Sequence, residues 1–210
     1  TVLHLVLEQA LHNTTVEVNL LDDNNEPTIT DVPLSFTDLR TGANHPQVVH
    51  SLGYKNSTDT FYLDPVPTYR LTLHTLPSKG MDSIRLTPGK HNVISVGDMT
   101  QGILTPQFPN TRRNDYGNLS VDLYENGECI SFYSMNIGTS VKVLSGFYDA
   151  IFHTTPPTLV ENIEVADGTP TEITISSPGS LMLQSSASGY GSIVDALTLE
   201  NVVQLPFGNP

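Results

Sequence analysis

The chain contains one sequence pattern twice, at a fixed spacing. Residues 68–96 read TYRLTLHTLPSKGMDSIRLTPGKHNVISV, and the stretch that starts 79 positions later reads FYDAIFHTTPPTLVENIEVADGTPTEITI. Without gaps, seven of the 29 positions are identical: Tyr69/Tyr148, His74/His153, Thr75/Thr154, Pro77/Pro156, Ile84/Ile163, Gly89/Gly168 and Ile94/Ile173. This period is too long for a solenoid repeat and fits a small sandwich domain that has been duplicated.

Alternating apolar and polar residues predict β-strands along most of the chain. Residues 16–20, 32–36 and 119–123 follow this pattern, and a period of two places alternate side chains on one face of a pleated strand. Turn-forming pairs such as Pro88-Gly89 and Asp167-Gly168 separate the runs at short intervals. We therefore predict an all-β fold of tandem antiparallel β-sandwich units, Ig-like or transthyretin-like, that arise from the repeat.

The repeat also sets the predicted domain boundaries. Residues 1–98 form a first sandwich, residues 99–177 form a second, and residues 178–210 resemble the start of a third. Two correspondences carry the last prediction: Gly102-Ile103-Leu104 matches Gly179-Ser180-Leu181, and Tyr116-Gly117-Asn118-Leu119 matches Tyr190-Gly191-Ser192-Ile193. Because so short a segment cannot bury a core alone, it is either an incomplete third unit or an extension strand.

The N-terminal segment, residues 2–7, reads VLHLVL and fits either a strand or part of an amphipathic helix. We favour a strand because the rest of the chain is β. An apolar, uncharged strand must be covered by other residues. It is either a core strand of the first sandwich or a strand that is exchanged onto an open sheet edge of another copy.

Acidic residues dominate the charge of the chain. There are 22 Asp and Glu against 9 Lys and Arg, which gives a formal net charge of -13. Such a surface repels phosphate backbones and anionic headgroups, so nucleic acid and membrane surfaces are poor partners. No apolar run approaches the ~20 residues that a membrane span requires. The simplest role of this charge is solubility.

Cys129 is the only cysteine, so neither an intrachain disulfide nor a cysteine-based zinc site can form within one chain. Its neighbours Ile130, Phe132 and Tyr133 have the composition of a strand, which predicts a small buried hydrophobe rather than a nucleophile. Scarce cysteine argues against a disulfide-stapled eukaryotic secreted domain and is compatible with a bacterial periplasm or cell surface.

Several stretches resemble known β-rich modules. The first unit contains VEVNLLDDNNEP, VPLSFTDLRTG and TFYLDPVPTYRLTLHT in this order, and it is similar to carboxypeptidase regulatory-like and transthyretin-like sandwich modules. Residues 68–193 contain TYRLTLHTLP, LTPGKHNVISV, VLSGFYDAIFHTTPP, VENIEVADGTPTEITISSPGSL and SGYGSI, which resemble the tail region of von Willebrand factor A (VWA) domain proteins from Bacteroidota. The VWA domain and its DxSxS metal motif are absent. The resemblance implies an extracytoplasmic accessory region with no catalytic residues.

Catalytic motifs are missing from the sequence, which contains no G-x-S-x-G, H-E-x-x-H, P-loop or complete dinucleotide-binding motif. His74 and His153 occupy equivalent repeat positions, and we expect each ring to bond to the backbone in a polar niche near a strand end. We place Asp122, Glu125 and Glu128 near a hairpin tip, where solvation keeps their pKa values ordinary. The prediction is that the protein is not an enzyme.

The loop Asp22-Asp23-Asn24-Asn25-Glu26 is the candidate metal site, with Asp22, Asp23, Asn24 and Glu26 as calcium ligands. Calcium binds six to eight oxygens, and an acidic loop offers several. However, this loop matches only the start of an EF-hand, and Pro27 stands where that motif requires glycine. Asp and Asn also favour turns without any metal, so a cofactor-free loop is the alternative.

Glycan binding would require exposed aromatic rings, and the chain has no tryptophan. The candidate rings are those of Tyr54, Tyr62, Tyr116, Tyr133 and Tyr190, although alternation places several tyrosines inside.

Together these features predict a non-enzymatic, secreted, extracytoplasmic β-sandwich protein of the bacterial periplasm or cell surface. Its predicted role is structural or adhesive, as the accessory stalk region of a cell-surface protein. One alternative is a pilus-like fibre subunit that joins other copies or a protein partner through exposed strand edges. Another is a module that binds glycan or peptide.

Overall fold

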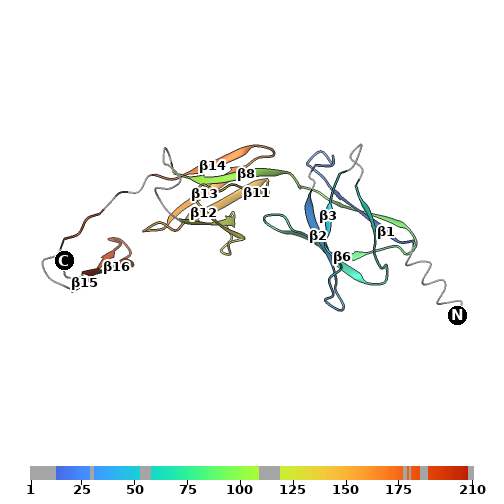
Figure 1. Cartoon of the computed structure of the whole chain (residues 1–210), viewed down its shortest axis with the longest axis horizontal. Helices are drawn as coiled ribbons and strands as arrows, with labels where there is room; N and C mark the ends of the chain where they lie inside the picture. Colours follow the sequence, from blue (N-terminus) through green and yellow to red (C-terminus); the bar gives the residue numbers. More distant parts are fainter. Residues whose placement is uncertain are drawn as a thin grey trace. The chain divides into compact units, whose positions relative to one another are not determined.

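The computed structural model describes residues 13–28, 31–52, 58–108, 119–176, 179, 181–184 and 189–207. Within these residues every regular element is a β-strand, as Figure 1 shows. The all-β class predicted from the sequence is therefore confirmed. The predicted strand at residues 2–7 lies outside the described residues.

The strands form two sets of seven and a final pair. The first set comprises β1 (Thr15–Leu20), β2 (Val32–Asp38), β3 (Val48–His50), β4 (Thr60–Tyr62), β5 (Thr68–Leu73), β6 (Lys79–Arg85) and β7 (His91–Val96). The second set comprises β8 (Gln101–Gln107), β9 (Ser120–Glu125), β10 (Tyr133–Asn136), β11 (Val141–Leu144), β12 (Gly146–Phe152), β13 (Thr158–Val165) and β14 (Pro170–Thr174). The final pair is β15 (Gly189–Val194) and β16 (Asn201–Phe207).

The two sets, called here the first and the second repeat, have the same sheet topology. In the first repeat the sheet orders are β4-β1-β7 and β3-β2-β5-β6. In the second repeat they are β11-β8-β14 and β10-β9-β12-β13. Each strand of the first repeat thus has its counterpart seven strands later, as expected of tandem β-sandwich units.

The ladder between β1 and β7 departs from the antiparallel prediction. Strands β1 and β7 pair in parallel, from Thr15 opposite His91 to Leu20 opposite Val96. A parallel pair requires a long crossover connection, and five intervening strands supply it here. Alternation along the sequence does not encode this, because it fixes which face a residue takes but not the direction of the neighbouring strand.

The core of the first repeat follows the predicted alternation. The residues of β1 alternate between buried and partly exposed, with Val16, Val18 and Leu20 inside. Phe36 on β2 and Tyr69 on β5 are both buried, with ring centroids 5.9 Å apart in an edge-on arrangement. Full burial of a side chain of this size stabilises the fold by about 1.5–3 kcal/mol.

The second repeat buries the equivalent positions. Leu123 on β9, together with Tyr148 and Phe152 on β12, is at most 3% exposed. Tyr148 is the counterpart of Tyr69, and its ring packs 5.4 Å from that of Phe132. The identical repeat residues Ile84 and Ile163 are also both buried. Repeat identity at these positions therefore reflects packing.

By its contacts the chain divides into two compact units. Unit 1 comprises residues 1–104, 141–147 and 164–171, and unit 2 comprises residues 105–140, 148–163 and 172–210. Neither unit is continuous in sequence, and the boundaries expected at residues 98 and 177 stay predictions.

The tail forms a two-stranded antiparallel sheet of β15 and β16, with Gly189 opposite Phe207. Apolar side chains of this segment are exposed: Tyr190 is 92% exposed, Leu197 95% and Leu199 76%. Segment 181–184, which precedes the hairpin, is not in a strand. The structure describes no helix with the length and apolar character that a bilayer span demands.

Candidate functional site

The acidic loop between β1 and β2 is a self-contained turn. One carboxylate oxygen of Asp22, Oδ1, accepts the backbone N–H groups of Asn24 and Glu26, each at 2.8 Å. The bond from the Glu26 backbone is the main cause that holds the pKa of Asp22 below its ordinary value. Asp22 therefore has a structural role in this loop with or without a metal.

Other acidic residues share a cavity with this loop. The cavity has a volume of about 400 Å³ within unit 1, and its acidic lining residues are Asp22, Asp23, Asp98, Glu164 and Asp167. Asn24 also lines it, whereas Glu26 does not. Among the described residues, no three Asp, Glu, His or Cys side chains are arranged to hold a metal ion. Calcium at this loop stays a prediction.

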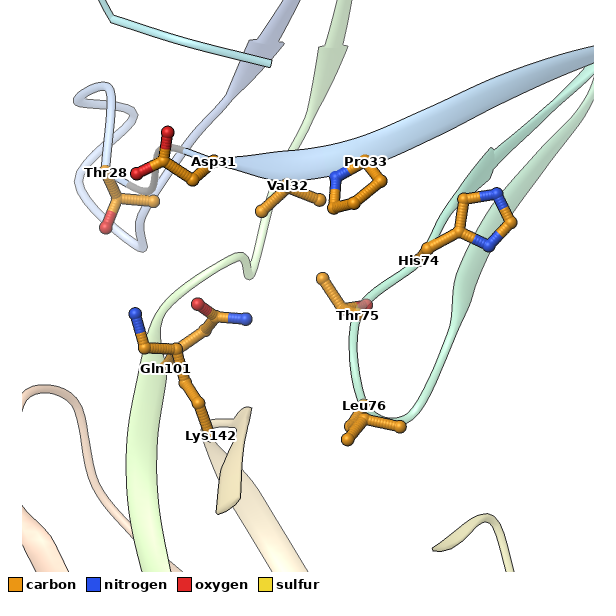
Figure 2. Close-up of a pocket in the computed structure, with 9 residues that line it drawn as sticks. All are labelled: Thr28, Asp31, Val32, Pro33, His74, Thr75, Leu76, Gln101 and Lys142. Carbon is orange, nitrogen blue, oxygen red and sulfur yellow. The ribbon is translucent and has the colours of Figure 1, made fainter. Parts of the chain in front are cut away.

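A second cavity of about 400 Å³ in unit 1 brings different ionisable groups near one another. Its lining includes Asp31, His74 and Lys142, and Figure 2 shows Asp31 and His74 at opposite ends of the group. The Nε2 atom of His74 already bonds to Ser35 Oγ at 3.0 Å. A general acid and base must both reach one reacting atom, and we assign no such pair to this cavity.

The two repeat histidines occupy equivalent niches, as expected, but the expected ring-to-backbone bonds are wrong. The His74 ring bonds to the Ser35 side chain, and the His153 ring bonds to Asp122 Oδ2 at 2.7 Å. The backbone bonds at the two positions are made by the main chain instead: the His74 N–H donates to Pro33 O, and the His153 N–H donates to Ser120 O. The histidines therefore join β5 to β2 and β12 to β9 through side chains.

Asp122 lies within β9, so its predicted place near a hairpin tip is wrong. Its carboxylate accepts hydrogen bonds from Ser134 Oγ and the His153 ring. Partial burial raises the pKa of Asp122, but the bonds from Ser134 and His153 outweigh it, so the net shift is downward. The hydroxyl donates to the carboxylate rather than to the imidazole, so this is no activated serine.

Cys129 is exposed, and the prediction that it is a buried hydrophobe is wrong. Its neighbour Ile130 is 83% exposed, and the strand that was expected here starts only at Tyr133. The tight turn at Gly127, where φ is 80°, separates Cys129 from β9.

The exposed tyrosines do not gather on one face. Tyr62 lies on β4, Tyr133 on β10 and Tyr190 on β15, in three different sheets. Tyr54 and Tyr116 lie outside the described residues. No observation on the described part of the chain therefore favours a stacking platform for sugars.

Comparisons with known proteins add no functional assignment. No family model matches the chain, and no curated protein matches it. The Bacillus anthracis TIE protein is similar in structure, with a TM-score of 0.30 and 11% identity over 78% of this chain and 33% of that one. A leucine-rich repeat protein from Bacteroides thetaiotaomicron VPI-5482 is similar at a TM-score of 0.27 and 11% identity, over 77% of this chain and 26% of that one.

The chain thus spans about a third or less of either protein, and likeness at this level carries no argument about function. The resemblance to VWA-protein tails and to carboxypeptidase regulatory-like modules stays a prediction.

Proposed function

We propose that the chain is a non-enzymatic, extracytoplasmic structural protein that serves as an accessory stalk region of a bacterial cell-surface protein. The observation that supports this most directly is the use of one seven-strand topology twice in series. The residues common to both copies, such as Tyr69 and Tyr148, are buried in packing positions. A duplicated scaffold whose shared apolar residues serve packing fits a spacer.

The charge of the chain is compatible with this role. A net charge of -13 keeps a surface-displayed spacer soluble and discourages contact with anionic lipid. The proposal includes no resident cofactor, and its one candidate ion is calcium at the Asp22–Glu26 loop. The extracytoplasmic location rests on the sequence resemblance and on the scarcity of cysteine.

Sedimentation velocity of the purified chain tests the role, first with calcium and then with chelator. A stalk segment should sediment as one elongated monomer in both conditions. A compact monomer would contradict the spacer, and large heterogeneous species would replace it with the fibre subunit. For the location, added protease should cleave the chain on intact source cells, while an internal cytoplasmic marker survives.

The fibre alternative has one supporting observation, the exposed apolar side chains of the tail hairpin. Edge strands with such residues invite pairing with other chains. The test is deletion of residues 1–12, which should abolish any assembly if that segment is the exchanged strand. Continued assembly of the truncated chain would exclude this form of strand exchange.

A further inference from the structure

The second cavity of unit 1, drawn in Figure 2, lies between two pairs of strands that are distant in sequence. One wall is formed by the start of β2 and the turn after β5, where the His74 N–H donates to Pro33 O at 2.9 Å. The other wall is the ladder of β8 and β11, in which Gln101 lies opposite Leu144. The Leu144 N–H donates to Leu76 O at 2.7 Å, so a backbone bond joins the two walls. The volume of about 400 Å³ is within the range of sites for small organic ligands.

Two opposite charges line this cavity without pairing with each other. Lys142 and Gln101 are diagonal neighbours on one face of the β8–β11 ladder, because Lys142 lies opposite Ile103. Within the described part of the chain, neither the Lys142 ammonium nor the Asp31 carboxylate makes a hydrogen bond or an ion pair. The Gln101 amide and the Thr28 hydroxyl are equally unbonded there. The cavity thus offers both donors and an acceptor that its own residues leave unused.

The backbone at Asp31 supports the same conclusion. Its φ of 61° lies in the left-handed region, which aspartate adopts more readily when its side chain hydrogen-bonds locally. The Asp31 N–H donates to His50 O at 2.8 Å and so fixes the main chain, whereas the carboxylate makes no such local bond among the described residues. The main chain therefore holds this carboxylate at the cavity in an uncommon conformation, with both oxygens available to a ligand.

The remaining lining favours an organic ligand over a sugar or a metal ion. Val32, Pro33 and Leu76 form its apolar part. None of the lining residues that the structure describes is Phe, Tyr or Trp, so the cavity has no ring of the kind on which sugars stack. Its two side chains that could bind a metal, Asp31 and His74, lie at opposite ends in Figure 2. The best match is a molecule that carries both charges and an apolar group.

We propose that this cavity binds a small zwitterion, either a free α-amino acid or a dipeptide. The ligand carboxylate accepts hydrogen bonds from the Lys142 ammonium and the Gln101 amide, and the ligand ammonium donates to the Asp31 carboxylate. The ligand side chain lies against Val32 and Leu76. This binding function is additional to the stalk role and does not depend on it.

Titration of the full chain with L-leucine and with leucyl-leucine tests the proposal, followed by the amide NMR shifts. At millimolar concentrations of the probe, saturating shifts should centre on Val32, Leu76 and Gln101. The tighter of the two probes is then compared with its N-acetylated form, which lacks the ammonium, and with its C-terminal amide, which lacks the carboxylate. Each blocked form should bind about tenfold or more weakly, because each loses a hydrogen bond to a charged group.

Two variants assign each charge of the ligand to its partner. Asp31→Asn retains a residue that tolerates positive φ, and it should abolish the preference over the N-acetylated form while the preference over the amide remains. Lys142→Met should do the reverse. Lys90→Met is the control, because it removes the same charge from an exposed residue that does not line the cavity, and both preferences should survive it.

Each outcome decides the proposal. The absence of saturating shifts at the cavity with both probes overturns the site. Equal affinity for the blocked and unblocked forms overturns the recognition of a zwitterion, and unchanged preferences in Asp31→Asn and Lys142→Met show that other groups bind the charges. None of these results bears on the stalk function, which sedimentation of the chain tests separately.

Discussion

At Gly102 an added methyl group would meet closely packed backbone atoms. A Cβ atom there would lie 2.4 Å from the backbone oxygen of Ala166 and 2.5 Å from Cγ1 of Val165. The backbone oxygen cannot rotate away as a side chain end could. Gly102→Ala should therefore lower the free energy of unfolding by about 1–3 kcal/mol, measured by urea denaturation.

The control for this substitution is Gly97→Ala, because no atom lies within 4 Å of the Cβ position at Gly97. Its free energy of unfolding should stay within about 0.5 kcal/mol of that of the parent. Equal free energies of unfolding for both variants would show that β8 can move away from Ala166. In the sequence, Gly102 is noticeable only because it matches Gly179 in the repeat. The match does not reveal that the backbone of Ala166 lies against Gly102, because this contact forms only when the chain folds.

The Asp122–His153 pair makes stability depend on pH. The folded pKa of Asp122 is depressed, so its contribution is complete above the unfolded value of about 3.9 and is lost as pH falls through the folded value. Asp122→Asn should cost a few tenths to about 1 kcal/mol at pH 7. That difference from the parent should vanish in acid, below the folded pKa.

Unfolding midpoints between pH 2 and pH 7 measure this effect. Ser35→Ala is the control, because in the equivalent niche the His74 ring bonds to a hydroxyl rather than to a carboxylate. Its cost should not change through the acidic range. A pH-independent cost for Asp122→Asn would mean that the carboxylate acts only through hydrogen bonds that asparagine also makes.

At the scale of elements, alternation located the strands well but their ends poorly. The buried faces of β1, β2 and β9 were readable from sequence because one face of each strand is apolar. The stretch around Cys129 was not, because Ile130 and Phe132 look like strand residues although the turn at Gly127 keeps them out of β9 and β10. Local composition cannot show that a turn has displaced a segment from its sheet.

The candidate site was predictable only in part for a similar reason. The acidic loop could be found because its residues are adjacent in sequence. The packing of Leu144 against the first repeat could not be predicted, because its N–H donates to the backbone oxygen of Leu76, almost 70 positions earlier in the chain.

Strand β11 should therefore be more important to unit 1 than its four residues suggest. Leu144→Ala removes a nearly buried side chain from the cluster of the first repeat, and we expect a loss of about 2–4 kcal/mol. Lys142→Ala on the same strand changes an exposed residue and should cost less than about 0.5 kcal/mol. Urea denaturation gives both values.

Hydrogen exchange at Leu76 locates the effect. Its amide and those of its neighbours should exchange faster in Leu144→Ala than in Lys142→Ala. If both variants lose the same stability with unchanged exchange at this turn, Leu144 does not close the end of the first repeat.

For the whole molecule, the excess of acidic residues should make stability sensitive to salt. Like charges repel in the folded chain, and raising salt from about 10 mM to about 150 mM shortens the screening length from about 30 Å to about 8 Å. We therefore expect the thermal midpoint to rise with sodium chloride. This general effect must be separated from calcium binding at the Asp22–Glu26 loop.

Calcium is therefore added at constant ionic strength, so that only specific binding raises the midpoint further. A bound ion stabilises the fold by RT ln(1 + [L]/Kd), which is about 1.4 kcal/mol at ten times Kd. Asp23→Asn should abolish this gain, because Asp23 is a predicted ligand that lines the acidic cavity. Glu161→Gln removes the same charge from an exposed position on β13 and should preserve it. If the parent and both variants respond alike, the cation acts through the overall charge and the loop is only a turn held by Asp22.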